Sequence, residues 1–302
     1  MRVLDRSICV IRPSLKKTWH LIFSKRPHEY VGRFLVKLIP ESYQSRVRNE
    51  FFTARGPRGI LADIVRAELN RQYYSSKTDE ETRNRDREMF WGATPGKRWH
   101  EFTKARYHEE DPHHSEFLQP RRLLKGQISD FLASSGEYGT ICEIGTGNGM
   151  FLHDLSKQSP SIKRFVGVDL NKEQILENRR TYAGTGLEFV HGEITDWIRN
   201  ECKVGTIFVA IETFEFFTQN ELEQLFRLIR EKVRPAAIAM FALAESRACS
   251  EVVSRPRASI AFNHNYVYLL KQYDYRVFRQ EIQGGSPYDA ICLLAIAPSG
   301  EG

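Results

Sequence analysis

The sequence predicts an α/β protein with a doubly wound, mostly parallel seven-stranded sheet, an antiparallel last strand and a helical segment before the sheet. Three observations predict this fold. From residue 116 onward, short apolar runs alternate with amphipathic segments, which is typical of a parallel sheet covered by helices on both faces. A glycine-rich loop joins the first apolar run to the next helix. The last two apolar runs are separated only by a short segment around Gly284-Gly285-Ser286-Pro287, so they must pair antiparallel.

Residues 1–115 are expected to form a separate helical region, because they show no alternation of strands and helices. It would serve as a lid, an oligomer interface or a substrate-binding part. Two apolar stripes have helical spacing: Val31, Phe34, Leu35 and Leu38 before Pro40, and Leu61, Ile64, Val65 and Leu69. The polar run 77–88 is expected to be a solvated helix or a linker. Phe90, Trp91 and Trp99, which follow it, are expected to pack on the neighbouring domain, and the alternative is that they line a pocket.

Residues 116–302 are expected to form the sheet domain. Its first helix carries an apolar face and ends at Ser134-Ser135-Gly136; the face is formed by Leu123, Leu124, Ile128, Phe131 and Leu132. Strands are then expected over 140–144, 164–168, 187–191, 205–211 and 235–242, alternating with helices over 149–158, 172–180, 194–200 and 219–231. A helix over 265–273 and strands over 275–282 and 289–297 complete the order.

The charge of the chain is unevenly distributed. The 302 residues carry a net charge of +6, but residues 1–60 hold 13 Lys and Arg against 4 Asp and Glu, a balance of +9. A basic segment on a slightly acidic body suggests an anionic ligand there, such as phosphate, nucleic acid or a lipid headgroup. A solvated helical surface rich in Arg is the alternative, and composition does not separate the two.

The cysteines indicate free thiols in a reducing compartment rather than disulfides or a zinc site. They are odd in number and scattered, with no Cys-x-x-Cys pair: Cys9, Cys142, Cys202, Cys249 and Cys292. The first residues lack the apolar run of a signal peptide, and no apolar stretch approaches the length of a transmembrane helix. We therefore expect a cytoplasmic protein.

The strongest motif is the loop that follows the first expected strand, in which Glu143 precedes Gly145, Gly147 and Gly149. Glycine allows a sharp turn and a close approach of a ligand to the main chain. A dinucleotide fingerprint has the spacing Gly-x-Gly-x-x-Gly, but position 150 is Met. An acidic residue before the loop suits a cationic amino acid rather than a pyrophosphate. This spacing therefore argues against a dinucleotide enzyme.

A second carboxylate lies at the end of the next expected strand. Asp169 follows Gly145 by 24 residues, and a carboxylate at that strand end can accept hydrogen bonds from both hydroxyls of a ribose. The alternative role for Asp169 is to cap the helix that begins near residue 172.

Residues 140–217 resemble the motif series of class I S-adenosylmethionine (SAM)-dependent methyltransferases, and the resemblance extends over about residues 120–297. It implies a Rossmann-like fold, SAM as cofactor and S-adenosylhomocysteine as product. It places Glu143 at the start of the glycine loop and Asp169 on the ribose. Glu193, where the family more often has Asp, would lie beside the adenine. The implied cofactor-binding residues are Glu143, Gly145, Thr146, Gly147, Asn148, Gly149, Asp169, Leu170, Gly192, Glu193, Ile194, Ile211 and Glu212.

The segment after the fourth strand is similar to the Glu-x-x-Glu-His segment of many small-molecule O- and N-methyltransferases. In some relatives the carboxylates and histidines bind a divalent metal. Here Phe216 replaces the final His, so we expect no metal. Glu212 is expected to help close the cofactor pocket and is a catalytic candidate. Glu215 is expected to cap the following helix.

His264 is the candidate proton acceptor, because it stands at the entrance to the last helix and the pKa of His lies near neutrality. A histidine that packs or caps is the alternative role. Arg247 and Tyr266 are the candidates to hold the substrate, with Arg247 suited to an anionic one.

The expected function is methyl transfer from SAM to an oxygen or nitrogen of a small molecule, sugar or natural product. An RNA methyltransferase guided by the basic N-terminal segment is one alternative, although no Asn-Pro-Pro-Tyr-like segment for a flipped base follows the fourth strand. A non-catalytic scaffold, with the methyl site blocked by Phe214, Phe216 or Phe217, is the other. The intact glycine loop argues against it.

Overall fold

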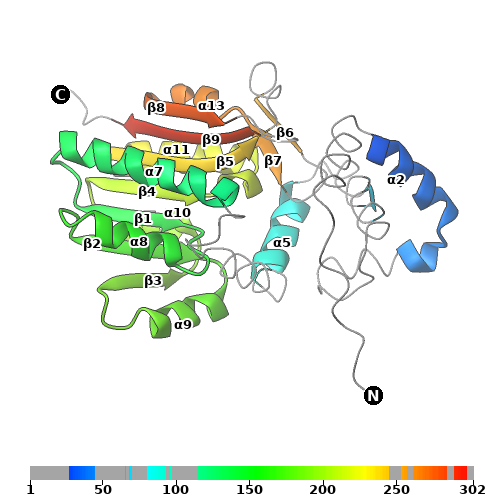
Figure 1. Cartoon of the computed structure of the whole chain (residues 1–302), viewed down its shortest axis with the longest axis horizontal. Helices are drawn as coiled ribbons and strands as arrows, with labels where there is room; N and C mark the ends of the chain where they lie inside the picture. Colours follow the sequence, from blue (N-terminus) through cyan, green and yellow to red (C-terminus); the bar gives the residue numbers. More distant parts are fainter. Residues whose placement is uncertain are drawn as a thin grey trace.

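The computed structural model describes residues 27–44, 80–92, 115–244, 253–256, 261–283 and 289–297, together with residues 65, 68, 69, 72 and 96. Two described helices, α2 (Pro27–Leu38) and α5 (Glu80–Trp91), come from the N-terminal region. The remaining described elements form the sheet domain. In Figure 1, α5 lies next to this domain and α2 lies at the far end of the molecule.

The domain is built on a seven-stranded sheet with the order β3-β2-β1-β4-β5-β9-β8. Its strands are β1 (Thr140–Ile144), β2 (Arg164–Asp169), β3 (Leu187–His191), β4 (Thr206–Ile211), β5 (Ala236–Ala244), β8 (Arg276–Gln283) and β9 (Asp289–Ala297). Neighbours from β3 to β5 pair in parallel, whereas β9 is antiparallel to both β5 and β8. The predicted fold class is therefore confirmed. The strand order reverses between β1 and β4, where open α/β sheets bind ligands beyond the carboxyl ends of their strands.

Helices cover both faces of the sheet (Figure 1). They are α7 (Ser115–Ser134), α8 (Met150–Gln158), α9 (Lys172–Thr181), α10 (Ile194–Asn200), α11 (Gln219–Lys232) and α13 (Tyr266–Gln272). Alternate residues of β4 enter different cores: Ile207 packs with α7, α8 and α9, and Phe208 packs with α10, α11 and α13. A strand buried on both faces needs apolar residues at every position, which explains its continuous apolar run. The expected division near residue 115 falls at the first residue of α7.

Two short features between the main elements were not predicted. A 3₁₀ turn, η2 (Phe214–Phe216), follows β4. Strands β6 (Ser254–Pro256) and β7 (Phe262–His264) form a separate antiparallel pair just before α13. Each is three residues long, too short for a periodic pattern to be recognised.

The first apolar stripe of the N-terminal region is in a helix, as predicted, but most of it faces outward. Val31, Phe34 and Leu38 are exposed. Val36, on another side of α2, is buried against Val65 and Leu69 of the second stripe. Leu61 and Ile64, the other two residues of the second stripe, lie outside the described residues.

No helix in the described part of the chain combines the length and the apolar character needed to cross a bilayer. Cys142, Cys202 and Cys292 are free thiols. Cys9 and Cys249 lie outside the described residues.

Candidate cofactor site

A cavity with an empty volume of about 1050 Å³, including its open mouth, lies at the carboxyl ends of β1, β2, β3 and β4. Its wall brings together nearly all of the expected cofactor-binding residues: Glu143, Gly145, Thr146, Gly147, Asn148, Asp169, Leu170, Gly192, Glu193, Ile194, Ile211 and Glu212. Gly149, also expected to bind the cofactor, is not part of the wall.

The loop between β1 and α8 needs glycine for two different reasons. Gly145 has φ 67°, and a Cβ there would lie 2.6 Å from Cγ2 of Thr213, so glycine permits both the turn and the close approach of the loop after β4. Gly149 has φ 72°, and a Cβ there would lie 2.9 Å from the ring of Phe189. Gly149 is therefore required for packing at the start of α8, which explains its absence from the cavity wall.

Asp169 is held by backbone amides on both carboxylate oxygens. Its Oδ2 accepts a 2.8 Å hydrogen bond from the amide of Gly147, and its Oδ1 accepts one of 2.8 Å from the amide of Asn171. The cap of α9 is Asn171, whose side chain accepts from the amide of Gln174. The helix-capping role considered for Asp169 is thus performed by Asn171. Each oxygen of Asp169 has a second lone pair with which to accept a ribose hydroxyl.

Glu143 is a buried carboxyl whose pKa is strongly shifted. Burial raises the pKa of Glu143 to about 8; the hydrogen bond from Thr146 and the charge of Arg121 lower it, and the charge of Asp169 raises it. The hydroxyl of Thr146 donates to Oε2 of Glu143 over 2.7 Å. A cation bound beside Glu143 would favour the ionised form of this carboxyl.

Glu212, directly after β4, combines an unusual backbone with an ion pair. Its φ is 51°, a left-handed conformation that is uncommon for a residue other than glycine and is often found at functional sites. Its amide donates to the carbonyl of Phe241 over 2.8 Å. Its carboxylate pairs with Arg121 of α7, whose guanidinium lies 5.5 Å from the ring centre of Phe241. Arg121 also lines the cavity, and the sequence had not indicated it.

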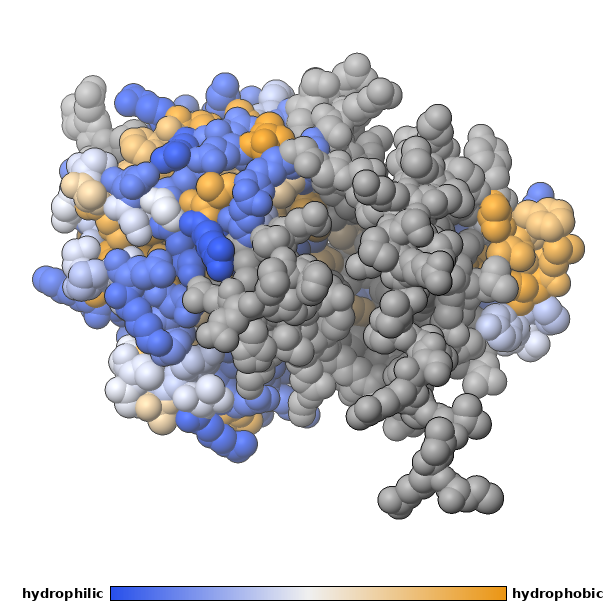
Figure 2. Space-filling view, in the orientation of Figure 1, coloured by the Kyte–Doolittle hydropathy of each residue, from blue (hydrophilic) through white to orange (hydrophobic). Residues whose placement is uncertain are grey.

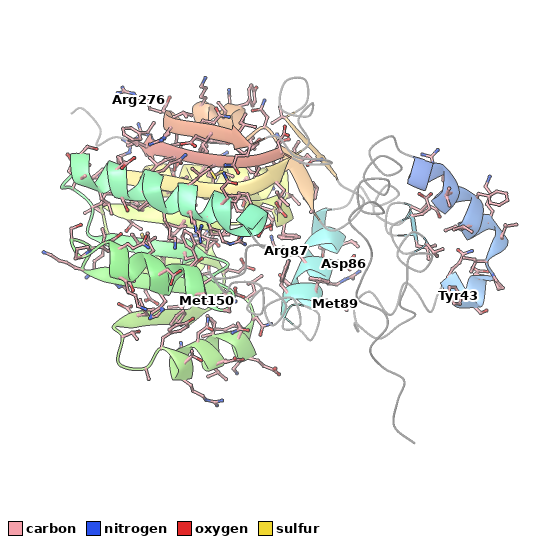
Figure 3. The ribbon with its side chains drawn as sticks, viewed as in Figure 1. Tyr43, Asp86, Arg87, Met89, Met150 and Arg276 are labelled. Carbon is pink, nitrogen blue, oxygen red and sulfur yellow. The ribbon has the colours of Figure 1, made fainter. Side chains whose placement is uncertain are left out.

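Helix α5 contributes two further residues to the wall, Arg87 and Trp91. The guanidinium of Arg87 donates to Glu221 over 2.7 Å, lies 3.8 Å from Glu193, and stands 5.1 Å from the ring centre of Phe217. In Figure 3 Arg87 is on the side of α5 that faces the domain. The polar run expected to be a solvated helix or linker thus includes a residue of the cavity wall.

Trp91, at the end of α5, contacts the sheet domain. Its carbonyl accepts a 2.8 Å hydrogen bond from the side chain of Asn171, and its ring meets Phe216 edge-on at 4.8 Å. The expected packing of Trp91 on the neighbouring domain agrees with these contacts. Trp99 lies outside the described residues.

His264 does not line the cavity. It is fully buried, with Nδ1 2.8 Å from the hydroxyl of Ser254 and Nε2 3.0 Å from the carbonyl of Phe217. Both ring nitrogens thus join β7 to neighbouring segments, which is the arrangement of a packed core histidine. A proton acceptor needs access to the substrate, so we do not retain that role for His264.

One of the two expected substrate-binding residues, Tyr266, lies away from the cavity. Tyr266, the first residue of α13, is 2% exposed in the core and is absent from the cavity wall. Arg247 lies outside the described residues.

The segment that resembles a metal site contributes one residue to the cavity wall and another to the protein interior. Phe216 is part of the cavity wall, and Glu215 is buried, with its carboxylate accepting a hydrogen bond from the amide of Leu243 in β5. Among the described residues, no three His, Cys, Asp or Glu side chains form a group able to hold a metal ion.

The chain is similar to known proteins in part of its sequence and in its fold. Residues 141–236 match the family model described as a methyltransferase domain. The crystal structure of magnesium protoporphyrin IX methyltransferase (ChlM) from Synechocystis PCC 6803 with bound SAM has a TM-score of 0.50 and 12% identity, covering 73% of this chain and 98% of that chain. N-methyltransferase NodS from Bradyrhizobium japonicum WM9 has a TM-score of 0.46 and 14% identity, covering 60% and 98%. None of the curated proteins matches the sequence.

The matched methyltransferase domain and the Rossmann-like sheet with its antiparallel β9 support a class I SAM-dependent methyltransferase. The chain is a SAM-dependent methyltransferase, and SAM is its cofactor. The cavity residues fit the group: Glu143 suits a cationic amino acid, Asp169 suits a ribose, and a Cβ at Gly192 would meet nothing within 4 Å, which leaves room for a base.

Proposed function

We propose that this enzyme methylates an oxygen or nitrogen of a small or medium-sized acceptor, such as a sugar or a natural-product intermediate. The observation that supports the proposal is the composition of one cavity wall: the aromatic residues Trp91, Phe216 and Phe217 stand in it together with the cofactor residues. Apolar walls with a few placed polar groups are typical of sites for small molecules. A cytoplasmic location is part of the proposal and is supported by the free thiols of the domain.

The roles proposed for the cofactor residues follow from their chemistry. Glu143 accepts the cationic amine, Asp169 accepts the ribose hydroxyls, and Glu193 accepts the exocyclic amine of the adenine. When bound, SAM supplies a methyl group on a positively charged sulfur. The contribution of the protein is to align the acceptor with that group and to exclude water.

Glu212 is the carboxylate we propose for the acceptor side. It lines the cavity, and the ion pair with Arg121 fixes the direction of its side chain. A hydroxyl or amine of the acceptor would donate a hydrogen bond to this carboxylate.

The scaffold alternative has little support from the three phenylalanines. Phe214 is buried in the core, while Phe216 and Phe217 form part of the wall of an open cavity. None of the three therefore argues for a filled site.

Calorimetry with SAM and S-adenosylhomocysteine tests the cofactor assignment. Gly147→Arg places a long side chain in the wall of the cavity, and we expect it to lower affinity at least about a hundredfold. The matched control is Gly136→Arg, an exposed position where a Cβ meets nothing within 4 Å, and it should bind as the native protein does. Absent binding in the native protein, or equal binding in the native protein and Gly147→Arg, would refute the assignment.

The acceptor class needs a second experiment. The native enzyme would be incubated with SAM and panels of hydroxyl- and amine-bearing small molecules, and S-adenosylhomocysteine production would be followed. Turnover with members of these panels supports the proposal. The RNA alternative predicts filter binding that falls steeply between two salt concentrations, together with turnover on RNA instead.

A further inference from the structure

The outward face of α2 is an exposed apolar surface, which we call the α2 face. It is formed by Val31, Phe34 and Leu38, which are 44%, 63% and 64% exposed. They recur at i, i+3 and i+7 and so lie along one side of the helix. Figure 2 shows apolar residues gathered over α2 at the end of the molecule far from the sheet domain. Single exposed apolar residues are ordinary, but an adjacent group of large ones marks an interaction surface.

Among the described residues, α2 packs through a side other than the α2 face. Val36 is buried with Val65 and Leu69, and Leu35 packs against the same cluster. The helix end is fixed by Gln44, whose side-chain amide donates to the carbonyls of Val36 at 2.8 Å and Ile39 at 2.9 Å. The helix is therefore apolar on two sides, of which one is used within the described residues.

The charges beside the α2 face indicate what it meets. Arg33 and Lys37 are exposed and lie one position before Phe34 and Leu38. Residues 1–60, to which α2 belongs, have a balance of +9. Helices that rest on a bilayer combine an apolar face with flanking Lys and Arg that reach anionic headgroups.

Two other occupants fit these observations less well. Pairing of two copies through the α2 face by two-fold symmetry would cover the apolar residues but would give no role to the positive charges of Arg33 and Lys37. An RNA would use the positive charges through its phosphates, but that contact gives no role to Val31 and Leu38. A partner surface that is both anionic and apolar would contact the exposed apolar residues and the basic residues of the helix together.

We propose that the α2 face docks the enzyme on a lipid bilayer with anionic headgroups, inserting Val31, Phe34 and Leu38 at the headgroup boundary while Arg33 and Lys37 contact the lipid charges. The inference does not depend on the identity of the methyl acceptor.

Vesicle flotation of the full chain tests the proposal. One set of vesicles contains phosphatidylcholine alone, and the other contains phosphatidylcholine mixed with phosphatidylglycerol. The native protein should float with the mixed vesicles, and this binding should weaken as salt is raised. Phe34→Glu should lower binding about tenfold or more, and Lys37→Glu should lower it mainly at low salt.

The control variant is Val204→Glu, which replaces another strongly exposed apolar residue, 66% exposed, on the sheet domain. It should float like the native protein. All variants should keep the native affinity for S-adenosylhomocysteine, which shows that they are folded.

Four results would overturn the proposal. The first is no preference for the mixed vesicles. The second is equal flotation of Phe34→Glu and the native protein. The third is an absence of flotation combined with a dimer that Phe34→Glu converts to a monomer in light scattering, which would assign the α2 face to a second copy. RNA binding abolished by Phe34→Glu, again without flotation, would assign it to nucleic acid.

Discussion

The amide of Gly147 donates a 2.8 Å hydrogen bond to Oδ2 of Asp169. This bond joins the loop after β1 to the end of β2, the two segments proposed to hold the amino acid and the ribose of SAM. The carboxylate proposed to bind the ribose is thus fixed in direction by hydrogen bonds from the backbone. A site held in its binding geometry loses less conformational freedom on binding.

Replacing Asp169 with Asn should therefore weaken cofactor binding. The Asn amide places an N–H₂ group where a carboxylate oxygen now accepts from a backbone amide, so two donors would face each other. We expect a loss of about 1–3 kcal/mol, or roughly 5- to 150-fold in the Kd for S-adenosylhomocysteine. Calorimetry measures it, with Asp196→Asn as the exposed control. An unchanged Kd for Asp169→Asn would contradict the proposed ribose contact.

Three glycine-to-alanine variants separate backbone strain from steric clash. Gly184 has φ 79° and open space around a Cβ, so Gly184→Ala should cost about 1–2 kcal/mol from the left-handed backbone alone. Gly167 has no positive φ, but a Cβ there would lie 2.6 Å from Oγ1 of Thr146, and overpacking should cost about 1–3 kcal/mol. Gly145 combines both effects, with Thr213 as the neighbour, and should cost the most. Thermal unfolding gives the ranking, and a Gly184→Ala loss as large as that of Gly145→Ala would contradict it.

Cofactor affinity should rise with pH through the titration of Glu143. Because burial raises its pKa to about 8, the carboxyl carries a proton near pH 7 in the free protein. A cationic amine favours the ionised form, so binding releases a proton and strengthens as pH increases toward 8. Calorimetry in buffers of different ionisation enthalpy measures the released proton. Glu143→Gln should bind more weakly and release fewer protons; identical proton release from this variant would exclude Glu143 as the source.

Removing Arg87, which lies on α5 and not in the sheet domain, should weaken cofactor binding. Arg87→Ala leaves Glu193 and Glu221 close together without their shared cation and removes part of the cavity wall. We expect the Kd for S-adenosylhomocysteine to rise about three- to tenfold. Arg85→Ala, which changes an exposed residue of the same helix, is the matched control. Equal values for the two variants would mean that Arg87 contributes nothing to cofactor binding.

The main elements of the domain were predictable because local patterns specify them. Strands such as β1 and β4 are buried on both faces, so their apolar runs stand out from the amphipathic helices between them. The glycine loop and Asp169 were predictable for a related reason, since positive φ and a strand-end carboxylate are set by a few adjacent residues.

The rest of the site depends on contacts between distant residues. Arg87 meets Glu221 across 134 positions, and Arg121 meets Glu212 across 91. Nothing in the polar sequence of α5 distinguishes Arg87 from Arg85. The burial of His264 was missed for the same reason. It follows from the pairing of β7 with β6, and strands of three residues are too short to be recognised in the sequence.

The position of β9 has a consequence for how the domain is made. This strand is translated after all the other strands, yet it lies between β5 and β8 in the finished sheet. Until β9 leaves the ribosome, β5 is an unprotected sheet edge with a nearly continuous apolar sequence, the kind of edge that recruits strands from other chains. Nascent chains that stop short of β9 should therefore aggregate or engage chaperones.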